Sequence, residues 1–250
     1  MIFVKDLNIV VRFLMEVSTM IYITGDTHAE FSRVINFCSR FKTKKEDIMI
    51  ILGDAGINYF RGLKDSLLKA KLSKLPITIF SIHGNHEIRP VNIPTYKEIM
   101  WNGGIVYQEE EYPNLLFAKD GEVYNFDGIK TLVIGGAYSV DKDYRIKMGY
   151  GWWADEQPND EIKAKVEKVI KDNNNTIDVI LSHTTPLKYE PTEVFLNFID
   201  QSTVDKSTEI WLDKIEDVVT YKKWYCGHFH TDKIIDNIHM MFKDITEFGV

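Results

Sequence analysis

Short runs of aliphatic and β-branched residues alternate along the chain with longer polar stretches. Each run is four to six residues long, which is the length of a buried strand. The runs occupy 21–24, 48–52, 77–82, 131–136 and 178–182. Because they are apolar throughout rather than alternating, they predict strands that are covered on both faces.

The polar stretches between these runs predict three helices. In 30–41 the apolar side chains recur at helical spacing, and 63–75 repeats this pattern. A third stretch follows Pro158, with acidic residues in its first turn and an Asn run at its end, as helix termini favour. The segment 107–130 contains several turn sequences and predicts an antiparallel addition. The chain is therefore expected to be α/β throughout.

Length and composition narrow the class of protein. The 250 residues can bury a sizeable core, and 44% hydrophobic with 27% charged residues excludes a disordered, collagen-like or disulfide-stapled chain. No repeat or linker is visible, so we expect one domain over 20–250. The net charge of −7 argues against sequence-blind binding to duplex nucleic acid. A small phosphorylated substrate is compatible with this negative charge, because bound metal ions can make the electrostatic field at a site positive.

The chain carries no sequence signal for export or membrane insertion. Its two cysteines stand in unrelated settings, which favours a reducing compartment. Arg12 and Glu16 interrupt the apolar N-terminal run, and no run approaches the ~18 apolar residues of a membrane span. We therefore expect a cytoplasmic protein without a membrane partner. Residues 1–19 precede a complete motif that opens at Met20, and are predicted to be an extension, either an added element or a non-native start.

Five short polar clusters follow the ends of predicted strands. They are GDTH at 25–28, GDAG at 53–56, GNHE at 84–87, SH at 182–183 and GHFH at 227–230. Six of the seven histidines lie in or beside them. Each cluster alone is compatible with an ordinary turn or a buried histidine. Because the carboxyl ends of strands gather at one edge of an α/β sheet, the set together predicts a metal site.

The donor types select the class of metal. Asp and Asn oxygens and imidazole nitrogens are hard to borderline ligands, and no thiolate accompanies them. Structural zinc prefers cysteines, and calcium prefers more carboxylates and fewer histidines. Manganese is our first choice, with iron, zinc, cobalt and nickel as alternatives, and the ligands suffice for two divalent ions.

In this order the clusters resemble the motifs D-x-H, GD, GNH(E/D), H and GHxH of the calcineurin-like metallophosphoesterases. The resemblance covers 21–242 and implies a four-layer αββα sandwich of two mixed β-sheets flanked by helices. It implies seven metal ligands in two groups: Asp26, His28 and His230 on one ion, Asn85, His183 and His228 on the other, and Asp54 bridging both. It also implies that His86 is the catalytic histidine, close to the leaving oxygen.

A mechanism follows from the charges of this site. Two divalent ions with two carboxylates leave a net charge of about +2, so a bridging water becomes hydroxide near neutral pH and attacks phosphorus. His86 then protonates the leaving alkoxide or donates a hydrogen bond to it. We expect a phosphodiesterase acting on nucleotides or nucleic-acid ends, with a phosphomonoesterase as the alternative. A catalytically silent scaffold would require gaps in the ligand set, and the sequence shows none.

The departures from the family pattern concern substrate choice. Protein Ser/Thr phosphatases of this superfamily carry GDxVDRG and an Arg before GNHE. Here Ile57 stands where the second Asp of GDxVDRG would be, Asn58 follows it, and His83 replaces the Arg that precedes GNHE. The Asp that would orient His86 and the phosphate-clamping arginines are therefore missing, which disfavours a protein phosphatase and an obligate protein partner. His83 is predicted either to contact substrate or simply to fill the strand end.

The loop 135–158 is the remaining candidate for substrate contacts. It is long for a compact domain, and long loops are often functional. Its residues include types that clamp phosphate or stack on bases: Tyr138, Arg145, Trp152 and Trp153. The alternative is that the two tryptophans are packing anchors. The loop is similar to one in small bacterial and phage members of the family, and we expect 138–153 to line or cover the metal site.

Overall fold

The strands form two mixed sheets. The structure is a computed structural model that describes residues 19–250. The first sheet has seven strands: β13 (Thr246–Glu247), β1 (Ile21–Thr24), β2 (Ile48–Ile51), β3 (Thr78–Ser81), β6 (Leu115–Ala118), β5 (Gly104–Glu109) and β4 (Tyr96–Trp101). The second has six: β11 (Lys233–Ile235), β12 (Ile238–Met240), β10 (Lys223–Cys226), β9 (Val179–Ser182), β8 (Ile129–Ile134) and β7 (Val123–Phe126).

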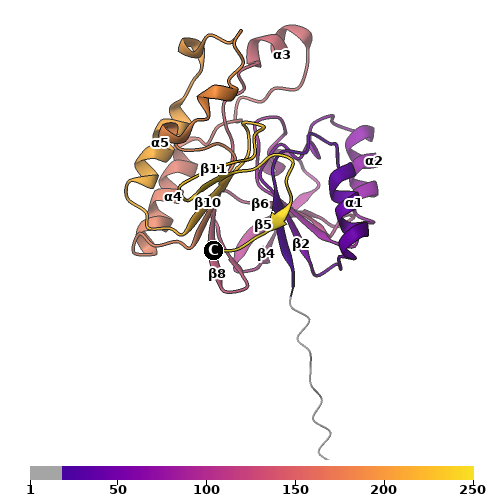
Figure 1. The fold of residues 1–250 in the computed structure, drawn as a ribbon. Coiled ribbons are helices and arrows are strands. Elements are labelled where there is room, and N and C mark those ends of the chain that lie inside the picture. Colours follow the sequence, from indigo (N-terminus) through magenta and orange to yellow (C-terminus); the bar gives the residue numbers. More distant parts are fainter. Residues whose placement is uncertain (1–18) are drawn as a thin grey trace, which may run out of the picture.

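Helices cover the outer face of each sheet. Figure 1 shows α1 (Ser32–Phe41) and α2 (Leu63–Leu72) beside the first sheet, and α4 (Asp160–Asp172) and α5 (Ser207–Glu216) beside the second. The helix α3 (Lys142–Met148) and the segment 187–204 stand together at one end of the molecule. That segment holds three short 3₁₀ helices, η2 (Leu187–Tyr189), η3 (Thr192–Val194) and η4 (Gln201–Thr203), and η1 (Pro90–Asn92) follows β3. The four-layer αββα sandwich is confirmed.

The strand runs are apolar throughout because both of their faces are buried. Along β2, Ile48 and Ile50 pack between the two sheets, whereas Met49 and Ile51 pack under α1 and α2. A third cluster joins the second sheet to its helices, for example through Leu212 of α5. Alternate residues of each strand thus serve two different cores, which fixes the strands and the positions of their ends.

The structure contains the five strands and three helices expected from the sequence. The segment 107–130 contributes antiparallel pairing through β5–β6 and β7–β8, as its turns indicated. The sequence pattern did not reveal α5 and β10, and it indicated a loop for the residues that form α3. The expectation for residues 1–19 falls, except for Thr19, outside the described residues. Within 19–250 no helix combines the length and apolar character needed to cross a membrane.

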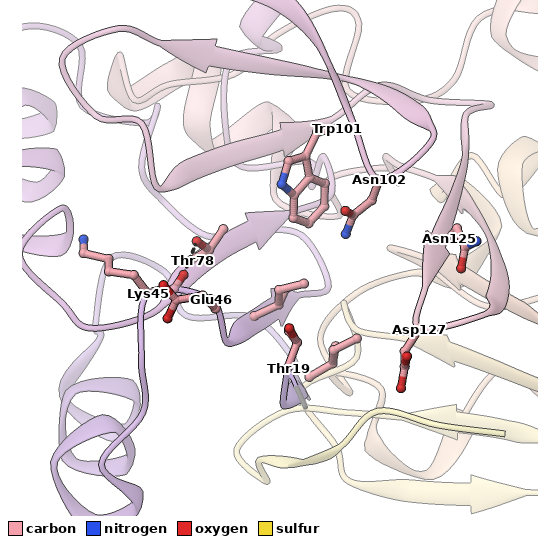
Figure 2. Close-up of a pocket in the computed structure, with 10 residues that line it drawn as sticks. Thr19, Lys45, Glu46, Thr78, Trp101, Asn102, Asn125 and Asp127 are labelled. Carbon is pink, nitrogen blue, oxygen red and sulfur yellow. Dashed lines mark hydrogen bonds between the residues drawn. The ribbon is translucent and has the colours of Figure 1, made fainter. Parts of the chain in front are cut away.

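A hollow of about 350 Å³ lies at the amino ends of β1, β2 and β3. Side chains of both sheets surround it, among them Trp101 at the end of β4, Asn102 from the β4–β5 turn and Asp127 from the β7–β8 turn (Figure 2). The polar clusters follow the opposite ends of these strands. The hollow is therefore separate from the residues predicted to carry the chemistry.

Candidate metal centre

Five strands bring their carboxyl ends, and the clusters that follow them, to one edge of the two sheets. The strands are β1, β2 and β3 of the first sheet and β9 and β10 of the second. Backbone hydrogen bonds link the turns: the Thr27 amide donates to the Asp54 carbonyl, and the Gly227 amide donates to the His183 carbonyl. The Asp26 side chain also accepts from the His228 amide at 2.9 Å, which joins the two sheets at the site.

The backbone of these turns is strained where donors are presented. His28, Asp54, His228 and His230 all have positive φ, between 45° and 67°. Non-glycine residues adopt this region at a cost of about 1–3 kcal/mol each, so it persists only where the surroundings impose it. Four such residues in one place indicate that the fold holds these side chains in position for a ligand.

Two glycines allow the turns to approach each other. A Cβ on Gly84 would lie 2.0 Å from Asp54 Oδ1, and a Cβ on Gly227 would lie 2.4 Å from Asp26 Oδ1. These separations are far below van der Waals contact. Glycine is therefore required at both positions for the carboxylates to lie where they do.

The first predicted ligand group is brought together by β1 and β10. His28 Nε2 and His230 Nε2 lie 2.8 Å apart, and Asp26 Oδ2 lies 3.7 Å and 3.3 Å from them. The Asp26 oxygen is buried and has no hydrogen-bond partner. Three donor atoms thus converge, and one of them is a buried carboxylate oxygen that needs a cation.

The second predicted group contains two acceptor atoms that face each other. The Leu52 carbonyl lies 2.7 Å from His183 Nδ1 and can only accept, so Nδ1 carries the proton of the neutral ring, and in that form Nε2 exposes a lone pair. The Asn85 amide nitrogen donates to Ser139 Oγ at 2.9 Å, which turns Asn85 Oδ1 toward the histidine. Asn85 Oδ1 lies 2.8 Å from His183 Nε2. A cation between these two atoms would replace their repulsion by coordination.

The same amide oxygen brings in the third member of this group. Asn85 Oδ1 lies 3.1 Å from His228 Nδ1. The ring of His228 in turn packs against that of His183, with the ring centroids 5.1 Å apart. The three predicted donors of the second group therefore share one location.

Asp54 lies between the two groups. Its Oδ1 is 3.7 Å from His183 Nε2, and its Oδ2 is 4.0 Å from His28 Nδ1. Oδ1 also accepts the His86 backbone amide at 2.8 Å. The structure therefore places this carboxylate where a ligand shared by two ions would have to be.

The donor set fits divalent metal ions. Burial lowers the pKa of His228 to about 3 and also lowers that of His28, so both imidazoles are neutral near pH 7. Burial raises the pKa of Asp26, but the neighbouring imidazoles of His230, His183 and His28 together outweigh this effect and keep the carboxyl charged. These are the protonation states that metal ligation requires. His28, Asp54 and His86 also approach one another closely, and so do Asp26, Asp54 and His183.

His86 lies beside this centre and contacts a carboxylate from another segment. Its Nε2 is 3.5 Å from Asp141 Oδ1, and its Nδ1 is 3.5 Å from Asp54 Oδ2. Arg145 donates to His86 Nδ1 at 3.1 Å and to both oxygens of Asp141 at 2.8 and 2.7 Å. The family position for an orienting Asp holds Ile57, which is buried in the core. Asp141 supplies the missing carboxylate from the residue before α3.

Two further support residues were not identified from the sequence. Glu87 is buried and accepts the amides of Gly84 and Gly56, so it ties two of the turns together. Burial and the neighbouring Asp54 raise the pKa of Glu87 to about 8. Glu156 accepts from Ser139, which in turn accepts from Asn85, and this chain fixes the orientation of the Asn85 amide. Glu87 belongs to the GNHE cluster, whereas nothing in the local sequence around Glu156 indicates its partner.

The predicted substrate contacts divide into two kinds. Tyr138 lines a cavity beside the metal centre, and Arg145 reaches His86. Trp152 instead donates its indole N–H to Glu156. Trp153 packs against Tyr59, with ring centroids 5.9 Å apart. The tryptophans are thus placed as packing anchors, and their role in substrate binding stays a prediction.

His83 is placed away from the cavity. It is 4% exposed, neither ring nitrogen has a partner, and burial lowers its pKa well below the usual value. A buried, neutral ring at the end of β3 corresponds to the filler role rather than to a substrate contact.

The fold and the converging donors define a metal-binding αββα sandwich. The family model for calcineurin-like phosphoesterases matches residues 19–232, so the chain belongs to the calcineurin-like phosphoesterase family. Similar solved structures include TT1561 of Thermus thermophilus, with 11% identity, a TM-score of 0.44, and 84% of this chain and 82% of that chain covered. The Aquifex aeolicus protein of unknown function AQ665 has 15% identity, a TM-score of 0.32, and coverage of 69% and 82%. No curated protein matches the sequence.

Proposed function

We propose that this protein is a metal-dependent phosphodiesterase. The observation that carries the proposal is the pair of facing acceptors, His183 Nε2 and Asn85 Oδ1, at 2.8 Å beside the partnerless oxygen of Asp26. Asp26, His28 and His230 would hold one divalent ion, Asn85, His183 and His228 the other, and Asp54 both. When bound, such ions lower the pKa of water and neutralise phosphate oxygens.

His86 is the residue proposed to deliver a proton to the leaving oxygen. The Arg145 guanidinium can only donate, so in the neutral ring His86 Nδ1 accepts and the proton is held at Nε2. Delivery of a proton requires the imidazolium, in which Nδ1 also carries a proton and has the Asp54 Oδ2 acceptor 3.5 Å away. Asp141 lies next to Nε2 and is charged, because its contacts with His86 and Arg145 lower its pKa against the opposing effect of burial. The carboxylate therefore orients the ring and stabilises the protonated form between turnovers.

The charge balance around His86 supports a diester rather than a monoester. A monoester carries a second negative charge, which favours a free cation in the site. Every nitrogen of Arg145 is engaged, with Asp141, His86, the Tyr59 hydroxyl and the Gly151 carbonyl. Lys206, which lines the adjoining cavity, pairs with Glu190 at 2.6 Å. Neither offers uncompensated charge to a dianion.

The test combines metal analysis with hydrolysis of two esters by one preparation. We expect two divalent ions per chain and faster hydrolysis of bis-p-nitrophenyl phosphate than of p-nitrophenyl phosphate, with manganese tried first. A preference for the monoester would contradict the diesterase assignment while leaving the metal centre intact. Absence of bound metal together with absence of hydrolysis would contradict both.

A further inference from the structure

A cavity of about 400 Å³ adjoins the metal centre and shares residues with it. Its lining includes Asn85, His86 and His228 together with residues from two other segments. This volume falls within the range of small-molecule sites. Any phosphate ester held by the metal donors would therefore direct one of its substituents into this space.

The walls of the cavity are predominantly hydrocarbon. Tyr138 and Val140 precede α3 and form one side, and Phe195, Leu196 and Val204 of the segment 187–204 form the other. Phe229 lies between the predicted ligands His228 and His230, and its ring is stacked on that of Phe195, with centroids 6.1 Å apart. The apolar wall is thus continuous with the metal centre.

The two oppositely charged side chains of the wall, Lys206 and Glu190, are paired with each other. Lys206 donates to Glu190 at 2.6 Å, and the Glu190 side chain is 8% exposed. Glu209 accepts from the Thr184 hydroxyl through one oxygen, and its second oxygen is buried without a hydrogen-bond partner. A nucleobase would need free donors and acceptors here, because unpaired polar groups are costly to bury. A hydrocarbon group makes no such demand.

Exposed apolar side chains also stand on the segments that contribute to the cavity or adjoin them. Leu196 is 51% exposed and Phe198 is 81% exposed in the segment 187–204, and Ile146 and Met148 of α3 are about half exposed. Exposed apolar side chains near a site favour contact with an apolar partner.

We propose that this cavity binds a hydrocarbon chain of the substrate, so that the substrate is an amphipathic phosphodiester with an alkyl or acyl chain. The inference rests on the proposed function, because the metal centre is what holds the phosphate. It adds the chemical class of the ester group, which the metal centre alone does not select.

The test measures binding of octylphosphonate and methylphosphonate to the metal-loaded protein by titration calorimetry. Their C–P bond is not a phosphate ester, so hydrolysis does not interfere. Each buried methylene contributes about fourfold in affinity, so burial of three of the seven additional carbons gives about 60-fold tighter binding of octylphosphonate. A gain below tenfold overturns the proposal.

A matched pair of variants tests whether the hydrocarbon chain of the ligand binds in this cavity. Leu196→Asp places a carboxylate on the wall and should weaken octylphosphonate at least fivefold without changing methylphosphonate. Leu67→Asp makes the same change at an exposed position of α2, and should alter neither ligand. Equal effects of the two variants on octylphosphonate would overturn the assignment of the cavity.

The same preparations separate this proposal from the proposed function. If the protein hydrolyses bis-p-nitrophenyl phosphate but binds octylphosphonate no more tightly than methylphosphonate, it is a phosphodiesterase whose cavity does not bind a hydrocarbon chain. That result would overturn only the inference. Clearly tighter binding of octylphosphonate than of methylphosphonate by a protein that hydrolyses no ester would support the cavity assignment and contradict the proposed activity.

Discussion

Asp141 offers a sharp test of the catalytic arrangement, because it acts through His86 and not on the metal donors. Asp141→Asn preserves size but removes the charge that lies 3.5 Å from His86 Nε2 and pairs with Arg145. The separation is longer than a direct hydrogen bond, and the Asp141 side chain is 37% exposed. We therefore take the low end of the free energy that an interaction with a charged group contributes, about 1.5 kcal/mol. We therefore expect about a tenfold loss of kcat on a substrate with a poor leaving group.

The assay compares two diesters that differ in their need for a proton. The loss should be about tenfold on diphenyl phosphate and under threefold on bis-p-nitrophenyl phosphate, whose leaving group departs as the anion. His86→Ala should lower kcat by about 10²- to 10⁴-fold with metal content unchanged. Adding Asp141→Asn to His86→Ala should cost nothing more, because residues that act through one another are not additive.

Asp143→Asn is the matched control, since it makes the same change within α3 at an exposed position. It should leave both rates unchanged. Equal losses on both diesters in Asp141→Asn, or loss of bound metal, would refute the positioning role. Either result would show that Asp141 serves α3 by holding Arg145, and that His86 is oriented by other contacts.

Three further predictions concern the frame of the site. Asp54→Asn should abolish activity and weaken metal retention, by more than the 10- to 100-fold typical of outer-shell changes, as metal analysis and kcat would show. Gly84→Ala should lower the free energy of unfolding in urea by about 3 kcal/mol because of the clash with Asp54, whereas Gly249→Ala, in open space, should change it little. Burial raises the pKa of Glu209 from 4.5 to about 7, so its ionisation costs stability increasingly as pH rises from 4.5 to 7. Relative to the parent, Glu209→Gln should therefore gain about 3 kcal/mol between pH 4 and pH 8, and a pH-independent difference would contradict the burial argument.

The donor set could be predicted from the sequence because topology leaves little freedom at strand ends. Asp26, Asp54 and Asn85 each follow a buried strand by a few residues, and β1, β2 and β3 are parallel neighbours. Their side chains must therefore meet at one edge. His183 likewise follows the predicted strand β9. His228 follows β10, a parallel neighbour of β9 that the sequence pattern did not reveal, so its place was predicted only from the resemblance of the GHFH cluster.

The supporting residues could not be predicted, because their positions depend on the path of irregular segments. Asp141 reaches His86 only because 135–141 returns over the metal centre, and no periodicity in the sequence encodes that return. The apolar wall at 187–204 is built from short 3₁₀ turns, whose side chains look in the sequence like scattered exposed hydrophobics. Long-range placement of this kind is set by tertiary packing rather than by local preference.

The location of Asp141 has a consequence for how this member of the family can vary. The carboxylate beside His86 is not on the β2 turn with the predicted metal ligand Asp54, but on the segment that also carries Tyr138 and Val140 of the cavity wall. The proposed proton delivery and the proposed contacts to the ester group therefore depend on one segment, whereas the predicted metal donors lie at the strand ends. A change in 138–145 can alter both leaving-group dependence and substrate choice without disturbing the metal donors. Conversely, a cavity redesigned for another ester group must keep Asp141 and Arg145 in register with His86, or lose turnover on poor leaving groups.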